Sequence, residues 1–149
     1  MLYEKKDIRV LPDDTDAFGR LNWLAYNRYC EMGEVGLMEV LGFPPMYFYK
    51  RHKISFPRRA ASFEYLSQVS PESLIDLETD IKKVGKTSLT LSHNFYKKIH
   101  EEGGRILAAK AEVTIVAFDG NTSDKTELPQ QLLEAIKRKC PEVFETESQ

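Results

Sequence analysis

The sequence predicts an α+β domain in which a curved antiparallel sheet of about five strands wraps round one long central helix. One observation is a single long helical pattern at about residues 22–41, which follows a short first strand. The other is a series of four downstream segments in which apolar and polar side chains alternate at every second position. A helix with a broad apolar face can bury it against one face of such a sheet.

The length and composition agree with one domain. The chain has 149 residues, of which 42% are hydrophobic and 30% are charged. A chain of this size buries about 68–70% of the surface of its unfolded form. We therefore expect a single domain over residues 1–149, with a core at about 5–138 and an acidic C-terminal tail at about 141–149.

Charge and hydropathy argue against several classes of partner. The formal net charge is -2, and Lys and Arg are spread along the chain, which gives no basis for binding nucleic acid. Residues 1–12 lack the apolar core of a signal peptide, and no apolar run approaches the roughly 20 residues that span a bilayer. Cys30 and Cys140 are expected to be a buried helix thiol and an exposed tail thiol in a reducing compartment. We expect a cytoplasmic protein with no nucleic-acid or membrane partner.

The first two elements are a strand and the long helix. A strand is predicted from Tyr3 to Leu11, and Pro12 ends it because proline has no N–H to donate. Gly42 is well placed to end the helix that follows, and the two prolines after it prevent continuation. The apolar positions of the helix are Trp23, Tyr26, Cys30, Gly33, Leu37 and Val40, and its polar arc is Asn27, Arg28, Glu31, Glu34 and Glu39.

The remaining elements follow from alternation and turn chemistry. Residues 43–49, FPPMYFY, contain too much proline for a strand and too many aromatics for a solvated loop, so we expect them to cover something. Four long strands are predicted at residues 54–67, 74–84, 87–99 and 106–118, joined as a meander by short turns near 71–73, 85–86 and 101–104. A polar loop, a short helix to about Lys139 and a frayed tail from Pro141 complete the chain.

Residues 13–29, DDTDAFGRLNWLAYNRY, carry the most informative pattern. A strand has ended, acidic residues occupy a short turn, and an apolar helix begins at once. A carboxylate such as that of Asp16, held beside the unpaired N–H groups of a helix start, lies next to donors that can bind an oxyanion. The alternative is that Asp16 is only a capping or turn residue, a role that Asp often fills.

This segment resembles the signature of hot-dog-fold thioesterases of the 4-hydroxybenzoyl-CoA thioesterase and acyl-CoA thioester hydrolase type. The order of elements from about residue 5 to 138 is also that of the hot-dog fold. The resemblance implies that Asp16 is the catalytic carboxylate, as nucleophile or as general base toward water. It also implies that the Trp23 backbone N–H is the oxyanion donor and that Gly19 shapes the approach. The matching residues are Asp14, Asp16, Gly19, Trp23 and Tyr26.

Other residues are candidates for substrate binding. Asn22 and Tyr26 face the site side of the helix start by spacing, although Tyr26 can equally be a core residue. Tyr47 and Phe48, in the predicted cover, suggest an apolar acyl group of moderate size. Asp13 and Asp14 are expected to be structural, because three carboxylates this close would repel one another.

The only basic cluster in the sequence comprises Lys50, Arg51, His52, Lys53, Arg58 and Arg59. It is either a solvated edge or a mouth that attracts the phosphates of coenzyme A or phosphopantetheine, with Arg58 and Arg59 as ligands.

The sequence departs from two related branches. Acyl-carrier-protein and long-chain branches usually carry a His and a pair of Asn after the turn, whereas only Asn22 matches here, so their binding chemistry does not carry over. A second hot-dog lineage uses a helix carboxylate and lacks the pre-helix Asp. Because Asp16 is present, we expect Glu31 and Glu34 to lie on a solvated or subunit-contacting edge.

The sequence therefore predicts a hydrolase of acyl-CoA or acyl-carrier-protein thioesters, acting in fatty acid metabolism without a cofactor. His52, His93 and His100 show no metal-ligand spacing, so we expect no metal. Since the family site lies at a subunit interface, a homodimer or homotetramer is expected. Alternatives are a hot-dog hydratase or dehydratase, which generally pairs a His with a carboxylate, and a non-catalytic acyl-thioester binding module.

Overall fold

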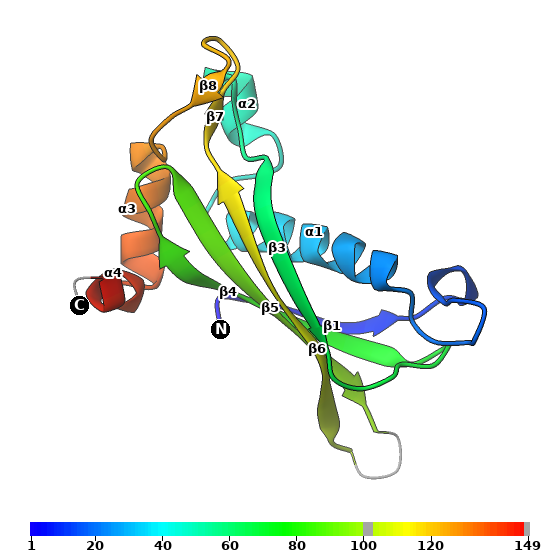
Figure 1. Ribbon diagram of the computed structural model, residues 1–149. Helices are drawn as coiled ribbons and strands as arrows, with labels where there is room; N and C mark the ends of the chain where they lie inside the picture. The colour runs from blue at the N-terminus through cyan, green and yellow to red at the C-terminus, as the bar shows by residue number, and fades with distance from the viewer. Residues whose placement is uncertain (100–102, 148–149) are drawn as a thin grey trace.

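The computed structural model describes residues 1–99 and 103–147, and they form one curved sheet with a long helix against one face (Figure 1). The first half contains β1 (Tyr3–Arg9), a 3₁₀ turn (Pro12–Asp14), α1 (Trp23–Val40), α2 (Tyr47–His52), β2 (Ile54–Ser55) and β3 (Arg58–Tyr65). The second half contains β4 (Leu74–Val84), β5 (Ser88–Lys98), β6 (Arg105–Val116), β7 (Phe118–Asp119), β8 (Asp124–Lys125), α3 (Gln130–Lys139) and α4 (Glu142–Glu147).

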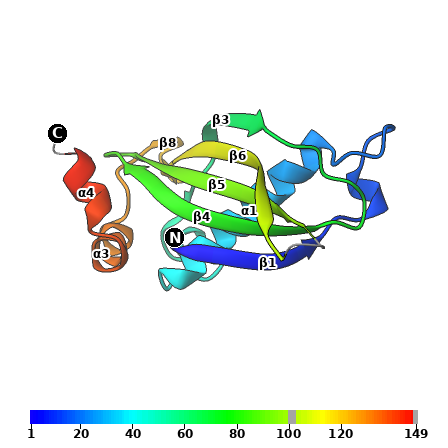
Figure 2. The ribbon, with the colours of Figure 1, turned by 90° about the horizontal axis from the view of Figure 1, so that it is seen from below.

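The main sheet has five strands in the order β1-β4-β5-β6-β3, and every pair is antiparallel. Seen from below, α1 runs along one face of this sheet (Figure 2). The predicted α+β class and the five-stranded sheet round one central helix are therefore confirmed.

The predicted four-strand meander is wrong at one connection. β3 pairs with β6 and not with β4, so residues 66–73 carry the chain across the sheet instead of forming a near-hairpin. Alternation identifies the two faces of a strand but contains no information about its neighbour. The predicted turn at 101–104 lies partly outside the described residues.

Two further segments differ from prediction. The strand predicted at 54–67 is divided into β2 and β3 around Pro57, which cannot donate to a ladder. The loop predicted at 119–127 contains β8 and the end of β7, which form a second sheet in the order β2-β7-β8. Residues 43–46 lead into α2, whose first residues complete the predicted cover, and residues 43–49 line a cavity.

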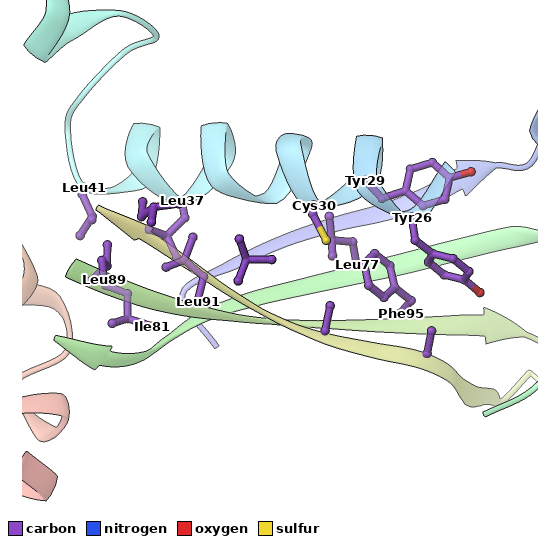
Figure 3. Close-up of a cluster of buried hydrophobic side chains, with 14 of the residues drawn as sticks. Tyr26, Tyr29, Cys30, Leu37, Leu41, Leu77, Ile81, Leu89, Leu91 and Phe95 are labelled. Atoms are coloured by element: carbon purple, nitrogen blue, oxygen red, sulfur yellow. The ribbon is translucent and has the colours of Figure 1, made fainter. Parts of the chain in front are cut away.

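The core lies between α1 and the sheet (Figure 3). Tyr26, Cys30 and Leu37 on α1 are buried, as are Leu77 and Phe95 on the strands. Burying each large side chain contributes about 1.5–3 kcal/mol. Gly33 allows the close approach of helix and sheet, because a Cβ there would lie 2.3 Å from Thr79 Oγ1 and 2.8 Å from His93 Nδ1.

The structure corrects the exposure of several residues. Trp23, predicted on the apolar face of α1, is 62% exposed, because it occupies the helix start beyond the sheet. Cys30 is buried as expected, but Cys140 is buried too. The tail is not frayed where it is described: α4 contacts β4 and buries Val143. Within residues 1–99 and 103–147, no helix combines the length and apolarity that a membrane crossing requires.

Candidate active site

A tight turn presents Asp16 just before α1. The Asp16 N–H donates to the Arg20 carbonyl at 2.7 Å, and the Gly19 N–H donates to the Asp16 carbonyl at 3.1 Å. Gly19 has a φ of +74°, in the left-handed region that a side chain makes costly. The turn therefore depends on Gly19 for its backbone shape.

The carboxylate of Asp16 is exposed and held by backbone donors. Its Oδ1 accepts hydrogen bonds from the Phe18 N–H at 2.8 Å and the Arg20 N–H at 3.1 Å. These two bonds, with that from Arg20 the stronger influence, hold the pKa of Asp16 below its usual value of 3.8. A turn-forming Asp makes the same bonds. Among the described residues Oδ2 has no partner, so an ionised oxygen remains open to solvent and substrate.

The start of α1 leaves one donor free beside this turn. Asn22 is the N-cap: its Oδ1 accepts from the Leu24 N–H at 2.9 Å, and its carbonyl accepts from the Ala25 N–H at 2.9 Å. The N–H of Trp23, the residue directly after this N-cap, has no acceptor in the described part of the chain. The predicted oxyanion donor is thus unpaired, while the Asn22 side chain is engaged in capping.

Asp14 joins the turn to the helix. Its side chain is buried, forms an ion pair with Arg28 and accepts from the Leu11 N–H at 3.1 Å. Its carbonyl accepts from the Asn22 N–H at 2.6 Å. This agrees with the expected structural role, and Asp13 is exposed.

Asp16, Trp23 and Tyr26 line one cavity of about 370 Å³. Tyr26 is also a core residue, with its ring edge-to-face with Phe95 at a centroid distance of 5.0 Å, and burial raises its pKa. The cavity has a second wall that sequence reasoning did not assign to the site. It comes from the end of β3 and the residues after it, brought there by the β3–β6 pairing: Tyr65, Leu66, Ser67, Gln68 and Val69.

Tyr47 and Phe48 line a different cavity, of about 380 Å³, between the second half of α1, α2 and residues 54–56. The Phe48 ring packs against Phe43 and Phe56, with centroid distances of 4.7 and 5.7 Å. From Trp23 to Met38, which lines this second cavity, α1 rises about 22 Å. In one chain, therefore, Asp16 and the predicted cover lie near opposite ends of α1 (Figure 1).

The predicted phosphate ligands differ in their surroundings. Arg58 forms ion pairs with Glu34 and, at 3.7 Å, with Glu31. Arg59 is exposed and has no ion pair among the described residues. Lys53 lies 5.0 Å from the centroid of the Tyr49 ring.

Glu34 is less exposed than the expected solvated edge, since only 16% of its side chain is accessible. Glu34 lines the second cavity, and burial raises the pKa of its carboxyl although Arg58 opposes the shift.

The described histidines provide no acid–base group at either cavity. His93 is fully buried, its Nδ1 lies 2.8 Å from Thr79 Oγ1, and burial lowers its pKa to about 4. It is therefore neutral at physiological pH. His100 lies outside the described residues. Within those residues, no group of three or more His, Cys, Asp or Glu side chains is arranged to hold a metal ion.

A family model described as the thioesterase-like superfamily matches residues 10–136. No curated protein sequence matches the chain.

Several solved structures share its fold. A gentisyl-coenzyme A thioesterase is 21% identical, with a TM-score of 0.72 over 88% of this chain and 98% of that one. The 4-hydroxybenzoyl CoA thioesterase from Pseudomonas sp. strain CBS-3 is 20% identical, with a TM-score of 0.77 over 89% and 99%. A hypothetical protein from Staphylococcus aureus, solved in complex with CoA, is 17% identical, with a TM-score of 0.80 over 93% and 83%.

Proposed function

The chain belongs to the thioesterase-like superfamily, and from this premise we propose that it hydrolyses an acyl-CoA or acyl-carrier-protein thioester with Asp16 as its catalytic carboxylate. Membership confirms the resemblance read from the sequence and the enzyme class of a thioesterase. One observation carries the assignment to Asp16. Asp16, whose carboxylate has an open oxygen, and Trp23, whose N–H is unpaired, line the same cavity, and Gly19 shapes the turn between them.

A thioester carbonyl needs an oxygen nucleophile and stabilisation of its developing oxyanion. As nucleophile, Asp16 Oδ2 bonds to the acyl carbon, the C–S bond breaks, the thiolate leaves, and water hydrolyses the resulting anhydride. As general base, Asp16 removes a proton from water while the water oxygen attacks the acyl carbon; the C–S bond then breaks, and the thiolate leaves and takes up that proton. In both routes the Trp23 N–H donates to the oxyanion. Loss of a single oxyanion donor lowers kcat for acyl transfer by on the order of 10²–10³.

The two cavities become parts of one site if β3 pairs with β3 of a second copy. Within the described residues, β3 has a strand on one side only, and its other edge is open. The Arg58 end of β3 follows the residues that line the second cavity, and the Tyr65 end lines the Asp16 cavity. An antiparallel pair about a two-fold axis sets opposite ends together. The second cavity of one subunit then lies beside Asp16 of its partner.

The edge at β1 is less suited to this pairing. Asp7 has a φ of +58°, and the register with β4 shifts between Lys5 and Ile8. Such a bulge twists an edge away from a partner strand. We therefore assign the homodimer to β3.

The remaining predicted roles belong to the same proposal. Arg59 and Lys53 contact the phosphates of the carrier, and Arg58 contributes less because two carboxylates already neutralise it. Asn22 and Tyr26 shape the channel, and Tyr47 and Phe48 cover the acyl group. Two dimers form the tetramer, consistent with exposed apolar side chains such as Leu24 on α1. We place the enzyme in the cytoplasm and in fatty acid metabolism.

Glu34 is the second candidate for the catalytic carboxylate, because it is mostly buried and lines the second cavity. The test is release of CoA from a panel of acyl-CoAs, detected with a thiol reagent, for Asp16→Asn, Glu34→Gln and wild type. We expect Asp16→Asn to lower turnover by on the order of a hundredfold or more and Glu34→Gln to retain it. The reverse result would transfer catalysis to the helix. A hydratase would consume an enoyl-CoA without releasing CoA, and a binding module would bind acyl-CoA without turnover.

A further inference from the structure

Most of the residues that line the second cavity are apolar. Phe43, Phe48, Leu91 and Ile115 are all buried, so its interior surface offers no hydrogen-bonding side chain at these positions. The full apolar lining is Val35, Met38, Phe43, Pro44, Pro45, Met46, Phe48, Ile54, Phe56, Leu91 and Ile115.

The polar residues that line this cavity are either paired or accessible to water. Glu34 is paired with Arg58, and the Tyr47 hydroxyl donates to Gln131 Oε1 at 3.4 Å. Tyr49 is exposed and Ser55 is half-buried. A ligand hydroxyl carried into the apolar part would therefore lose its bonds to water without gaining a partner.

We infer that this cavity receives an unsubstituted aliphatic acyl group and discriminates against hydroxylated aromatic acyl groups. The inference rests on the proposed function, since it takes the occupant to be the acyl part of a thioester. The structurally similar enzymes named above are thioesterases of 4-hydroxybenzoyl-CoA and gentisyl-CoA, and both of these acyl groups carry a phenolic hydroxyl. The apolar part of this cavity provides no hydrogen-bond partner for such a hydroxyl.

The size of the cavity suits a small acyl group. Its volume of about 380 Å³ lies near the lower end of the roughly 300–1,000 Å³ that small-molecule pockets occupy, so an acyl chain of medium length such as decanoyl is a suitable probe. A burial preference of this kind can reach about a hundredfold for one misplaced hydroxyl.

Val35 offers a way to fill the cavity without entering the core. It lies on α1, lines the cavity and is 42% exposed. Met32 lies three residues earlier on the same helix, is 41% exposed and does not line this cavity. Both residues also line a separate groove beside β1. Met32→Trp places a Trp on that groove without reaching the second cavity, so it is a matched control for Val35→Trp.

The experiment measures kcat/KM for acetyl-CoA, decanoyl-CoA and 4-hydroxybenzoyl-CoA. The wild type should prefer decanoyl-CoA to 4-hydroxybenzoyl-CoA by tenfold or more. Val35→Trp should lower the ratio of decanoyl to acetyl turnover at least tenfold, and Met32→Trp should leave that ratio within about twofold of wild type. A wild type that prefers 4-hydroxybenzoyl-CoA, or a Val35→Trp variant with an unchanged ratio, would overturn the inference.

A binding measurement separates this inference from the proposed function. Calorimetry with a non-hydrolysable decanoyl-CoA thioether reports on the cavity alone. Tight binding that Val35→Trp weakens tenfold, without turnover of any acyl-CoA, would support the cavity and refute hydrolysis. Turnover of acyl-CoA, together with equal affinity of wild type and Val35→Trp for the thioether, would support hydrolysis and refute the role of the cavity.

Discussion

The two ends of α1 are built from different kinds of interaction. At its start, backbone N–H groups hold an exposed carboxylate, and the chemistry depends on where charge is placed. At its far end, aromatic rings pack over an apolar cavity, and selectivity depends on shape and on the absence of polar partners. Because one helix keeps these regions about 22 Å apart, neither can serve the other within a single chain. Under the proposed function, the two regions therefore meet only when two copies of the chain pair.

The largest expected effect tests the reactive end. Asp16→Asn should lower kcat by on the order of a hundredfold or more, because an amide serves neither as nucleophile nor as base. Steady-state kinetics measures the loss of kcat. Circular dichroism should show an unchanged fold, and light scattering should show an unchanged oligomer. Asp13→Asn, an exposed neighbour, is the control and should change little. Near-normal turnover by folded Asp16→Asn protein would refute the assignment.

A hybrid dimer tests whether the two ends act across subunits. Neither Asp16→Asn nor Val35→Trp should hydrolyse decanoyl-CoA well by itself. A purified hybrid with one chain of each kind should recover about half of the wild-type activity per dimer, because one of its two sites combines an intact carboxylate with an intact cavity. If the hybrid shows only the average of its two parents, each site is built within one chain.

The pH profile distinguishes the carboxylates at the two ends. The pKa of Asp16 is lowered from 3.8 by backbone hydrogen bonds, so its reactive anion persists as the pH falls. The acidic limb of kcat/KM should then have its midpoint below 3.8 wherever the protein remains folded. Burial raises the pKa of Glu34 from 4.5, so a midpoint above that value would indicate Glu34 instead.

The smallest effect concerns the carrier. Arg59→Ala should raise KM about twofold to fivefold with little change in kcat, since an exposed charge contact of this size is similar in ground and transition states. Arg58→Ala should raise KM less, because Glu34 and Glu31 already neutralise Arg58. The change in KM between low and high salt should be smaller in Arg59→Ala than in the wild type. Equal effects of the two substitutions would contradict this ranking.

Sequence patterns predicted the parts of this molecule that depend on local periodicity. The helix from Trp23 to Val40 and the alternation of β4, β5 and β6 are properties of neighbouring residues. The Gly19 turn and the unpaired Trp23 N–H likewise follow from a short segment.

What the sequence did not predict depends on long-range pairing. Tyr65 reaches the Asp16 cavity only because β3 pairs with β6, and no local signal specifies that partner. The acidic composition after Pro141 concealed Val143, whose burial depends on a distant strand. The same composition led to Cys140 being placed in solvent.

The buried His93 limits how far this protein tolerates acid. In the unfolded chain its pKa is 6.5, whereas burial lowers it to about 4 in the fold. Between these values the unfolded chain binds a proton that the native state excludes, so native stability is present above pH 6.5 and is progressively lost as the pH falls toward 4. Gly33 of α1 lies against that imidazole, since a Cβ at this position would lie 2.8 Å from Nδ1. A charge on His93 would therefore appear where α1 meets the sheet, and acid would weaken that contact.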